Sequence, residues 1–316
     1  MNKINELFGT RYPVVQGGMA WCSGWRLAAA VSNAGGLGVI GAGSMTPAVL
    51  QEHVRRYRAV TNRPFGVNLP LTVRDIEDMV SAIIGEAVPI VFTSAGSPRA
   101  WTRIFQERGI IVVHVVSSAR FAVKCEEAGV DAIVAEGFEA GGHNGREETT
   151  TLCLLPAIRR VTTLPLLAAG GIGTGEAMLA ARVLGADGVQ VGTRFALTRE
   201  SSAHENFKRL CLSLEEGETR LLLKKLVPTR LAKGDFMTAV EEAEARGASA
   251  DELRELLGSG RARAGIFEGD LSAGELEIGQ VASLFRHEQG AAEVVEEIVA
   301  EYERALARHA TWTLDD

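Results

Sequence analysis

Eight short apolar runs recur along the first two thirds of the chain, and they constrain its fold more than any other feature. Each run is rich in Val, Ile or Leu and is bounded by glycine, proline or polar residues, as is typical of a strand buried on both faces. Segments of helical periodicity separate the runs, and several end at a glycine suited to cap a helix. The runs are 12–18, 36–43, 64–70, 89–96, 109–116, 131–137, 164–171 and 187–194, and the capping glycines are Gly35, Gly129 and Gly185.

This alternation of strand and helix predicts an α/β fold, a (β/α)8 TIM-type barrel over residues 1–210. An open, doubly wound sheet has the same periodicity and is the alternative. In a barrel, active sites lie at the carboxyl ends of the strands. Turns would explain glycines at these ends but not the polar side chains found there, so a pocket is expected. These polar residues are Gln16, Asn68, Thr93, Ser94, His114 and Glu136, and His114 is as compatible with the barrel core as with the site.

The character of the chain changes after Arg199. Residues 223–233 (LKKLVPTRLAK) are locally basic, and the segment that follows alternates acidic and apolar residues like an exposed helix. The closing segment has one apolar face, which includes Val294, Val295 and Ile298. We therefore expect residues 211–316 to form a mostly helical appendage that covers or flanks the barrel mouth.

The composition narrows the possible partners. The chain has 316 residues, 46% of them apolar, and a net charge of -7, which argues against nucleic acid or an anionic membrane as the main partner. No apolar run approaches the ~18 residues that span a bilayer, so a cytoplasmic protein with a small-molecule substrate is expected. Widely spaced cysteines and the lack of a metal-ligand spacing predict free thiols and no metal. A homo-oligomer is compatible with all of this.

Two glycine-rich turns follow the seventh and eighth runs. Gly170 and Gly171 come after one strand, and Gly192 and Thr193 come after the next. Glycines let the backbone approach an anion closely, and the loops after strands seven and eight form a recurrent phosphate site in this fold. The pair predicts a site for a phosphorylated cofactor, such as FMN, or for a phosphorylated substrate.

Several ordered motifs resemble the nitronate monooxygenase family, formerly called 2-nitropropane dioxygenases, and its relatives, the flavin-dependent type II enoyl-acyl carrier protein reductases. The resemblance runs from residue 4 to about 208 and resumes weakly at 267–285. It implies a barrel that binds FMN without a covalent bond. The motifs are YPVVQGGMAW, AVSNAGGLGVIGAG, PFGVN, AEGFEAGGHNG, LPLLAAGGI and GADGVQVGTRF.

Site residues follow from this resemblance. Gly17, Gly18 and Met19 would lie along the flavin ring and Asn68 near its polar edge, while the two glycine turns would hold the phosphate. Glu136 would accept a hydrogen bond from the flavin or the histidine, and Gln280 would approach the flavin from the appendage.

His143 matches the active-site histidine of both branches, and Gly141 and Gly142 would make its turn flexible enough to swing over the flavin. An imidazole titrates near neutral pH, so it can take a proton from a nitroalkane or bind the oxygens of a nitronate. Glu139, Glu147 and Glu148, in the same loop, are expected on its solvated rim.

The leading prediction is an enzyme that oxidises alkyl nitronates with O2 to carbonyl compounds and nitrite. The alternative is an NAD(P)H-dependent enoyl reductase, with the basic segment 223–233 as a dock for acyl carrier protein. Asn144 and Trp25 depart from the reductase pattern. A flavin-free barrel lyase or isomerase acting on a phosphorylated substrate, and a flavin-binding protein without turnover, are more distant alternatives.

Overall fold

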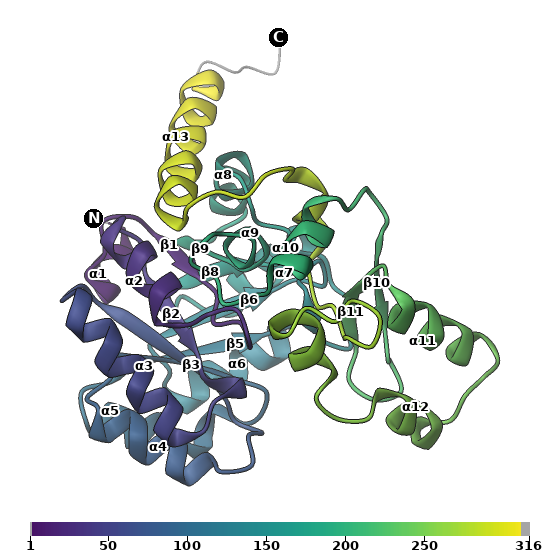
Figure 1. Cartoon of the computed structure of the whole chain (residues 1–316). Helices are drawn as coiled ribbons and strands as arrows, with labels where there is room; N and C mark the ends of the chain where they lie inside the picture. Colours follow the sequence, from purple (N-terminus) through teal and green to yellow (C-terminus); the bar gives the residue numbers. More distant parts are fainter. Residues whose placement is uncertain (1, 311–316) are drawn as a thin grey trace.

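The computed structural model describes residues 2–310. In this part of the chain, parallel strands form a sheet of eight in the order β1-β9-β8-β6-β5-β4-β3-β2 (Figure 1). They are β1 (Val14–Gln16), β2 (Gly38–Gly41), β3 (Phe65–Pro70), β4 (Ile90–Ser94), β5 (Ile111–Val116), β6 (Ala132–Glu136), β8 (Leu166–Ala169) and β9 (Gly188–Val191).

The first and last strands of this order also meet. A parallel bridge joins Val15 to Leu37, just before β2. The Leu37 N–H donates to the Val14 carbonyl, and the Gln16 N–H donates to the Leu37 carbonyl, each at 2.9 Å. These bonds close the sheet, so the predicted TIM-type barrel is confirmed and the open sheet is excluded.

Helices surround the barrel, and the glycines predicted to end three of them have left-handed backbones, with φ of 98° at Gly35, 77° at Gly129 and 106° at Gly185. A short first helix, α1 (Lys3–Phe8), places Phe8 against Phe92 inside the barrel, with ring centroids 5.9 Å apart. The outer helices are α2 (Trp25–Asn33), α3 (Pro47–Val60), α4 (Ile76–Gly85), α5 (Thr102–Gln106), α6 (Ala119–Ala128), α7 (Thr151–Arg159) and α8 (Gly175–Val183), with short 3-10 turns η1 (Ala42–Ser44) and η2 (Pro98–Ala100).

The chain beyond β9 is mostly helical, but it also contains a small antiparallel sheet that the sequence analysis does not anticipate. The strand β11 (Thr229–Ala232) lies in the centre of this sheet and pairs with β10 (Thr219–Leu222) on one side and with β7 (Gly142–His143) on the other. Figure 1 shows this sheet beside the barrel, with two helices projecting from it. The other elements are α9 (Thr193–Ala196), α10 (Glu205–Leu212), α11 (Asp235–Ala245), α12 (Ala250–Leu257), the π-helix η3 (Arg263–Phe267) and η4 (Gln280–Leu284).

The last helix, α13 (Ala291–His309), returns to the barrel and packs on α8 and α2. Its apolar face is buried as predicted, with Val294, Val295 and Ile298 each 1% exposed or less. The division of the chain at residue 210 stays a prediction, and α13 shows that the outer ring uses residues from beyond it. Within residues 2–310, no helix is both long and apolar enough to span a bilayer.

Candidate functional site

A cavity of about 240 Å³ opens at the carboxyl ends of the barrel strands. It gathers residues from the carboxyl ends of six barrel strands, with the loops after them, and from the part of the appendage that runs from η3 to η4. All but one of the predicted site residues line it, although their roles stay predictions. Those present are Gly17, Gly18, Met19, Asn68, Glu136, Gly141, Gly142, His143, Gly170, Gly171, Gly192 and Thr193.

Gln280 is the exception. It is exposed at the start of η4, and its backbone N–H donates to the Glu139 carbonyl at 3.0 Å. Its neighbours Ile278 and Val281 line the cavity instead. The segment therefore presents apolar side chains at this point, and a flavin contact by Gln280 stays a prediction.

The loop after β8 is shaped to hold an anion. Gly170 and Gly171 have φ of 88° and 70°, and a side chain on Gly170 would lie 2.5 Å from the Gly137 carbonyl oxygen. In the described chain, the N–H groups of Gly171 and Ile172 have no hydrogen-bond acceptor. Successive free N–H groups on a left-handed turn form a concave site for a phosphate.

Thr193, at the start of α9, lies on the same side of the cavity. Its hydroxyl oxygen accepts from the Gly279 N–H at 3.0 Å, which leaves the hydroxyl proton available to an anion. The later glycines serve packing instead: Gly173 faces the Phe285 ring, and Gly175 lies against α13 and donates its N–H to Glu301 at 2.7 Å. The anion site is therefore limited to the first turn after β8 and the first turn after β9.

The loop after β1 forms another wall of the cavity, and glycine is required there. A side chain on Gly18 would overlap Asn68, whose amide donates to the Phe92 carbonyl at 3.0 Å. Buried Gln16 does not reach the cavity. It braces the loop by accepting from the Val39 N–H at 3.0 Å and donating to the Ser23 hydroxyl at 2.8 Å.

Together these walls fit the cofactor that the sequence predicts. A bare glycine surface can face a planar ring, and free N–H groups with a threonine hydroxyl can bind a phosphate. Neither requirement depends on a charged side chain. The residues present are thus suited to FMN.

His143 lies on β7 and is held in place rather than free to swing. It pairs with Thr229 of β11, and the next residue, Asn144, donates its N–H to the Pro228 carbonyl at 2.7 Å. The Asn144 amide also donates to the carbonyls of Ala140 and Gly142. Asn144 thus braces the turn, and it does not line the cavity.

Two further contacts fix the same loop. Arg230 of β11 is 2% exposed and donates to the Phe138 carbonyl through Nε at 3.1 Å and Nη2 at 2.6 Å. A side chain on Gly141 would lie 2.5 Å from the Ile278 backbone. The expected flexible turn is therefore wrong for these residues, because the loop needs glycine for close packing.

Three glutamates line the cavity, and they differ in burial and in hydrogen bonding. Burial raises the pKa of Glu136, at the end of β6, to about 7. Glu139 accepts from the Thr151 N–H at 3.0 and 3.1 Å, so it caps α7 instead of lying on a solvated rim as expected. The third, Glu277, was missed by the sequence analysis, although Glu275 and Glu277 are conspicuous acids beside otherwise buried residues.

His114 belongs to the barrel core. It is 4% exposed within β5, and its Nδ1 lies 2.6 Å from the Thr93 hydroxyl oxygen. Burial lowers its pKa to about 4. The structure thus assigns both polar residues to the core, and neither lines the cavity.

Cys22, Gln190 and Ile266 also line the cavity, although they are not among the predicted site residues. Cys22 is 4% exposed, and burial raises the pKa of its thiol to about 12. It therefore stays protonated and contributes an unreactive apolar surface.

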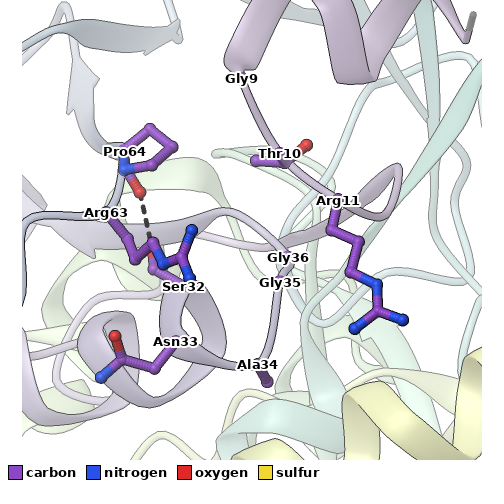
Figure 2. Close-up of a pocket in the computed structure, with 10 residues that line it drawn as sticks. All are labelled: Gly9, Thr10, Arg11, Ser32, Asn33, Ala34, Gly35, Gly36, Arg63 and Pro64. Carbon is purple, nitrogen blue, oxygen red and sulfur yellow. Dashed lines mark hydrogen bonds between the residues drawn. The ribbon is translucent and has the colours of Figure 1, made fainter.

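A second cavity, of about 120 Å³, lies among the loops that precede β1, β2 and β3. The Ser32 hydroxyl donates to the Pro64 carbonyl at 2.9 Å across it, and the side chains of Arg11 and Arg63 do not converge (Figure 2). This is the amino end of the barrel, where residues serve stability in this fold.

Comparisons with known proteins bear on the cavity at the carboxyl ends. The sequence model of the family described as nitronate monooxygenase matches residues 2–301. A Rhodococcus jostii protein named (3aS,4S,5R,7aS)-5-hydroxy-7a-methyl-1-oxo-octahydro-1H-indene-4-carboxyl-CoA dehydrogenase is 31% identical over 94% of each chain. A probable nitronate monooxygenase of Staphylococcus aureus is 32% identical over 76% of this chain and 80% of its own. The structure of FabK from Thermotoga maritima superposes with a TM-score of 0.94, at 36% identity over 99% of both chains.

Proposed function

Since the chain belongs to the nitronate monooxygenase family of flavin-dependent oxidoreductases, we propose that it binds FMN at the barrel mouth and oxidises alkyl nitronates with O2 to carbonyl compounds and nitrite. One observation carries the proposal: a histidine and a glycine-lined anion site share a single cavity. Family membership also removes the flavin-free lyase from consideration. A cytoplasmic location and a homo-oligomer stay predictions.

The glycine turns and Thr193 would hold the FMN phosphate, and Gly17, Gly18 and Met19 would face its ring. When bound, FMN would supply the electron acceptor for the oxidation. Asn68 would contact the polar edge of the ring, as the resemblance implies. Glu136 would serve as a hydrogen-bonding group beneath it, and as a neutral acid it would donate.

His143 is the proposed catalytic residue. It is exposed at the cavity wall, and its backbone is fixed by β11. Such an imidazole can remove the acidic α-proton of a neutral nitroalkane or, when protonated, donate to a nitronate oxygen. A fixed position favours catalysis because the proton transfer needs no loop movement.

Reduction or oxidation of a thioester is the second candidate, because the Rhodococcus jostii relative is named for a carboxyl-CoA substrate. Docking of acyl carrier protein by residues 223–233 has less support. Lys224 forms an ion pair with Glu148, and Lys233 with Glu218, each at 2.7 Å. Arg230 is buried. Lys225 is exposed and donates to the Ala248 carbonyl, so within the described residues it is the one exposed cation of this segment without an ion pair.

The test begins with the purified protein, which should be yellow and release FMN on denaturation. Propane-2-nitronate should bleach the flavin under anaerobic conditions, and O2 should restore the colour with release of nitrite. Rapid bleaching by NADH or NADPH, with turnover of crotonyl-CoA, would favour the thioester candidate. Protein that cannot take up FMN would overturn the proposal.

A further inference from the structure

Two glutamates lie on the segment between η3 and η4 that forms one wall of the cavity. Glu277 pairs with Leu231 through an antiparallel bridge, which places it beside the sheet that carries His143. Glu275 is two residues earlier and is buried, with 7% of its surface exposed. Both acids therefore lie next to the proposed catalytic loop.

The Glu277 carboxyl faces the cavity. It is a lining group, and one of its oxygens lies 2.6 Å from the point where a side chain on Gly142 would begin. Within residues 2–310, neither Glu275 nor Glu277 forms a side-chain hydrogen bond or an ion pair. A carboxyl without a protein partner at a cavity wall is available to a ligand.

No basic side chain neutralises the pair. Among the described residues, no lysine or arginine lines the cavity. The nearby cations are engaged elsewhere: Arg230 on the Phe138 carbonyl, Arg261 on the Ala273 carbonyl and Lys208 on Glu288. The charged and titratable groups that act on the pair are thus His143 on β7, Arg261, and the protonated thiol of Cys22.

These surroundings favour a neutral acid. Burial raises the pKa of Glu277 to about 7. Burial and the charge of Glu277 raise the pKa of Glu275 to about 7, while the charges of His143 and Arg261 oppose the shift. Two carboxyls this close resist double ionisation, so a proton remains on the pair near neutral pH.

We propose that Glu277 is a second catalytic residue that, in its protonated form, donates a hydrogen bond to the negatively charged oxygen of the substrate, and that Glu275 is a positioning residue that shares this proton with Glu277. The inference rests on the proposed function, in which this oxygen belongs to the nitronate. A neutral acid in a poorly hydrated site stabilises an anionic oxygen, whereas an ionised carboxylate would repel it.

The FMN-loaded protein is tested with isobutyrate, a carboxylate of similar size to propane-2-nitronate that also carries its negative charge on two oxygens. Binding is measured by calorimetry and by flavin absorbance from pH 5.5 to 8.5. For the wild type, the Kd should rise ~10-fold per pH unit once Glu277 ionises. Glu277→Gln keeps a neutral donor, so it should bind at least ~10-fold more tightly than the wild type at pH 8.5. Glu277→Leu should bind weakly at every pH.

Glu275→Gln distinguishes titration of Glu277 from titration of His143. It removes the charge beside Glu277, so the pH midpoint of isobutyrate binding should fall. Glu216→Gln, at an exposed site, is the matched control and should behave like the wild type. The inference is overturned if Glu277→Gln and Glu277→Leu both keep the wild-type affinities across the pH range. Failure of the wild type to bind FMN or to oxidise the nitronate would instead overturn the proposed function.

Discussion

Single residues at the cavity show why glycine recurs in this chain. Gly18, Gly141 and Gly170 each lie where a side chain would strike a neighbouring residue. A glycine selected for close contact keeps its loop rigid, although the sequence alone suggests flexibility. The cavity is therefore a closely packed surface that presents the two side chains proposed to be catalytic, His143 and Glu277.

His143→Ala should keep the bound FMN and lose at least ~100-fold in kcat, because an acid or base group contributes on this scale. His287→Ala is the control, since His287 is exposed on the appendage. Flavin absorbance and steady-state rates measure both effects. Wild-type turnover by His143→Ala would remove the histidine from the mechanism.

Gly170→Ala should purify with little FMN, because the new methyl group would meet the Gly137 carbonyl and displace the free N–H groups. Gly129→Ala has a similar φ, 77°, but open space around it. This control should lose about 1 kcal/mol of stability and keep a full complement of FMN. Equal FMN content in the two variants would contradict the anion site.

At the scale of elements, the small sheet decides where the loop that carries His143 lies. The strand β7 has only two residues and cannot be stable alone, so its position comes from β11 and from the buried Arg230. Strand pairing across about 85 positions of sequence thus couples the appendage to the site.

Arg230→Met should lower the free energy of unfolding by about 1–3 kcal/mol, since the Phe138 carbonyl would lose both donors in a buried place. It should also reduce kcat while FMN stays bound, because His143 is no longer fixed. Arg220→Met, in the exposed position beside Glu241, should cost less than about 0.5 kcal/mol. Urea unfolding and kinetics test the pair, and an unchanged kcat in Arg230→Met would show that fixing β7 is unimportant.

At the scale of the whole molecule, α13 completes the ring of helices with residues from the end of the chain. Arg194, next to the proposed phosphate site, donates to Glu297 of this helix at 2.5 Å and is 4% exposed. Glu301 accepts from the first N–H of α8. The distal helix thus supports the loops after β8 and β9.

Ile298→Ala should destabilise the protein by about 2–5 kcal/mol, because it opens a cavity beneath α13. Leu306→Ala removes a similar side chain from a position that is 49% exposed, so its effect should stay below about 0.5 kcal/mol. Chemical unfolding distinguishes them. Equal losses would mean that α13 does not pack on the barrel as described.

The pH dependence of stability should reflect the buried acids. The pKa of Glu275 is raised in the folded state to about 7, so the folded protein holds a proton that the unfolded chain releases near pH 4.5. The contribution of Glu275 to the free energy of unfolding therefore falls as pH rises from 4.5 to 7. His114 acts in the opposite direction, because its lowered pKa of about 4 costs stability as pH falls below 6.5.

Glu275→Gln isolates the first effect, since His114 is common to both proteins. The stability of the variant relative to the wild type should increase by at least ~1 kcal/mol between pH 5 and pH 8, as measured by urea unfolding. Glu216→Gln should show no such change. A pH-independent difference for Glu275→Gln would mean that its carboxyl ionises normally in the folded state.

Much of this protein could be predicted from local sequence. The eight apolar runs are the barrel strands, and the glycine turns at 170–171 and 192–193 lie on one cavity with His143. These features depend on periodicity and on the shared direction of parallel strands, both of which a short window of sequence contains.

Only the tertiary structure decided the rest. Glu277 lies more than 130 residues from His143, and nothing local to either indicates that β11 brings them together. The sequence likewise could not distinguish a site histidine from His114, or a mobile glycine turn from a packed one. The burial of a side chain, the groups that shift its pKa and the atoms that pack against a glycine all come from contacts between distant segments. They therefore appear only when the chain has folded.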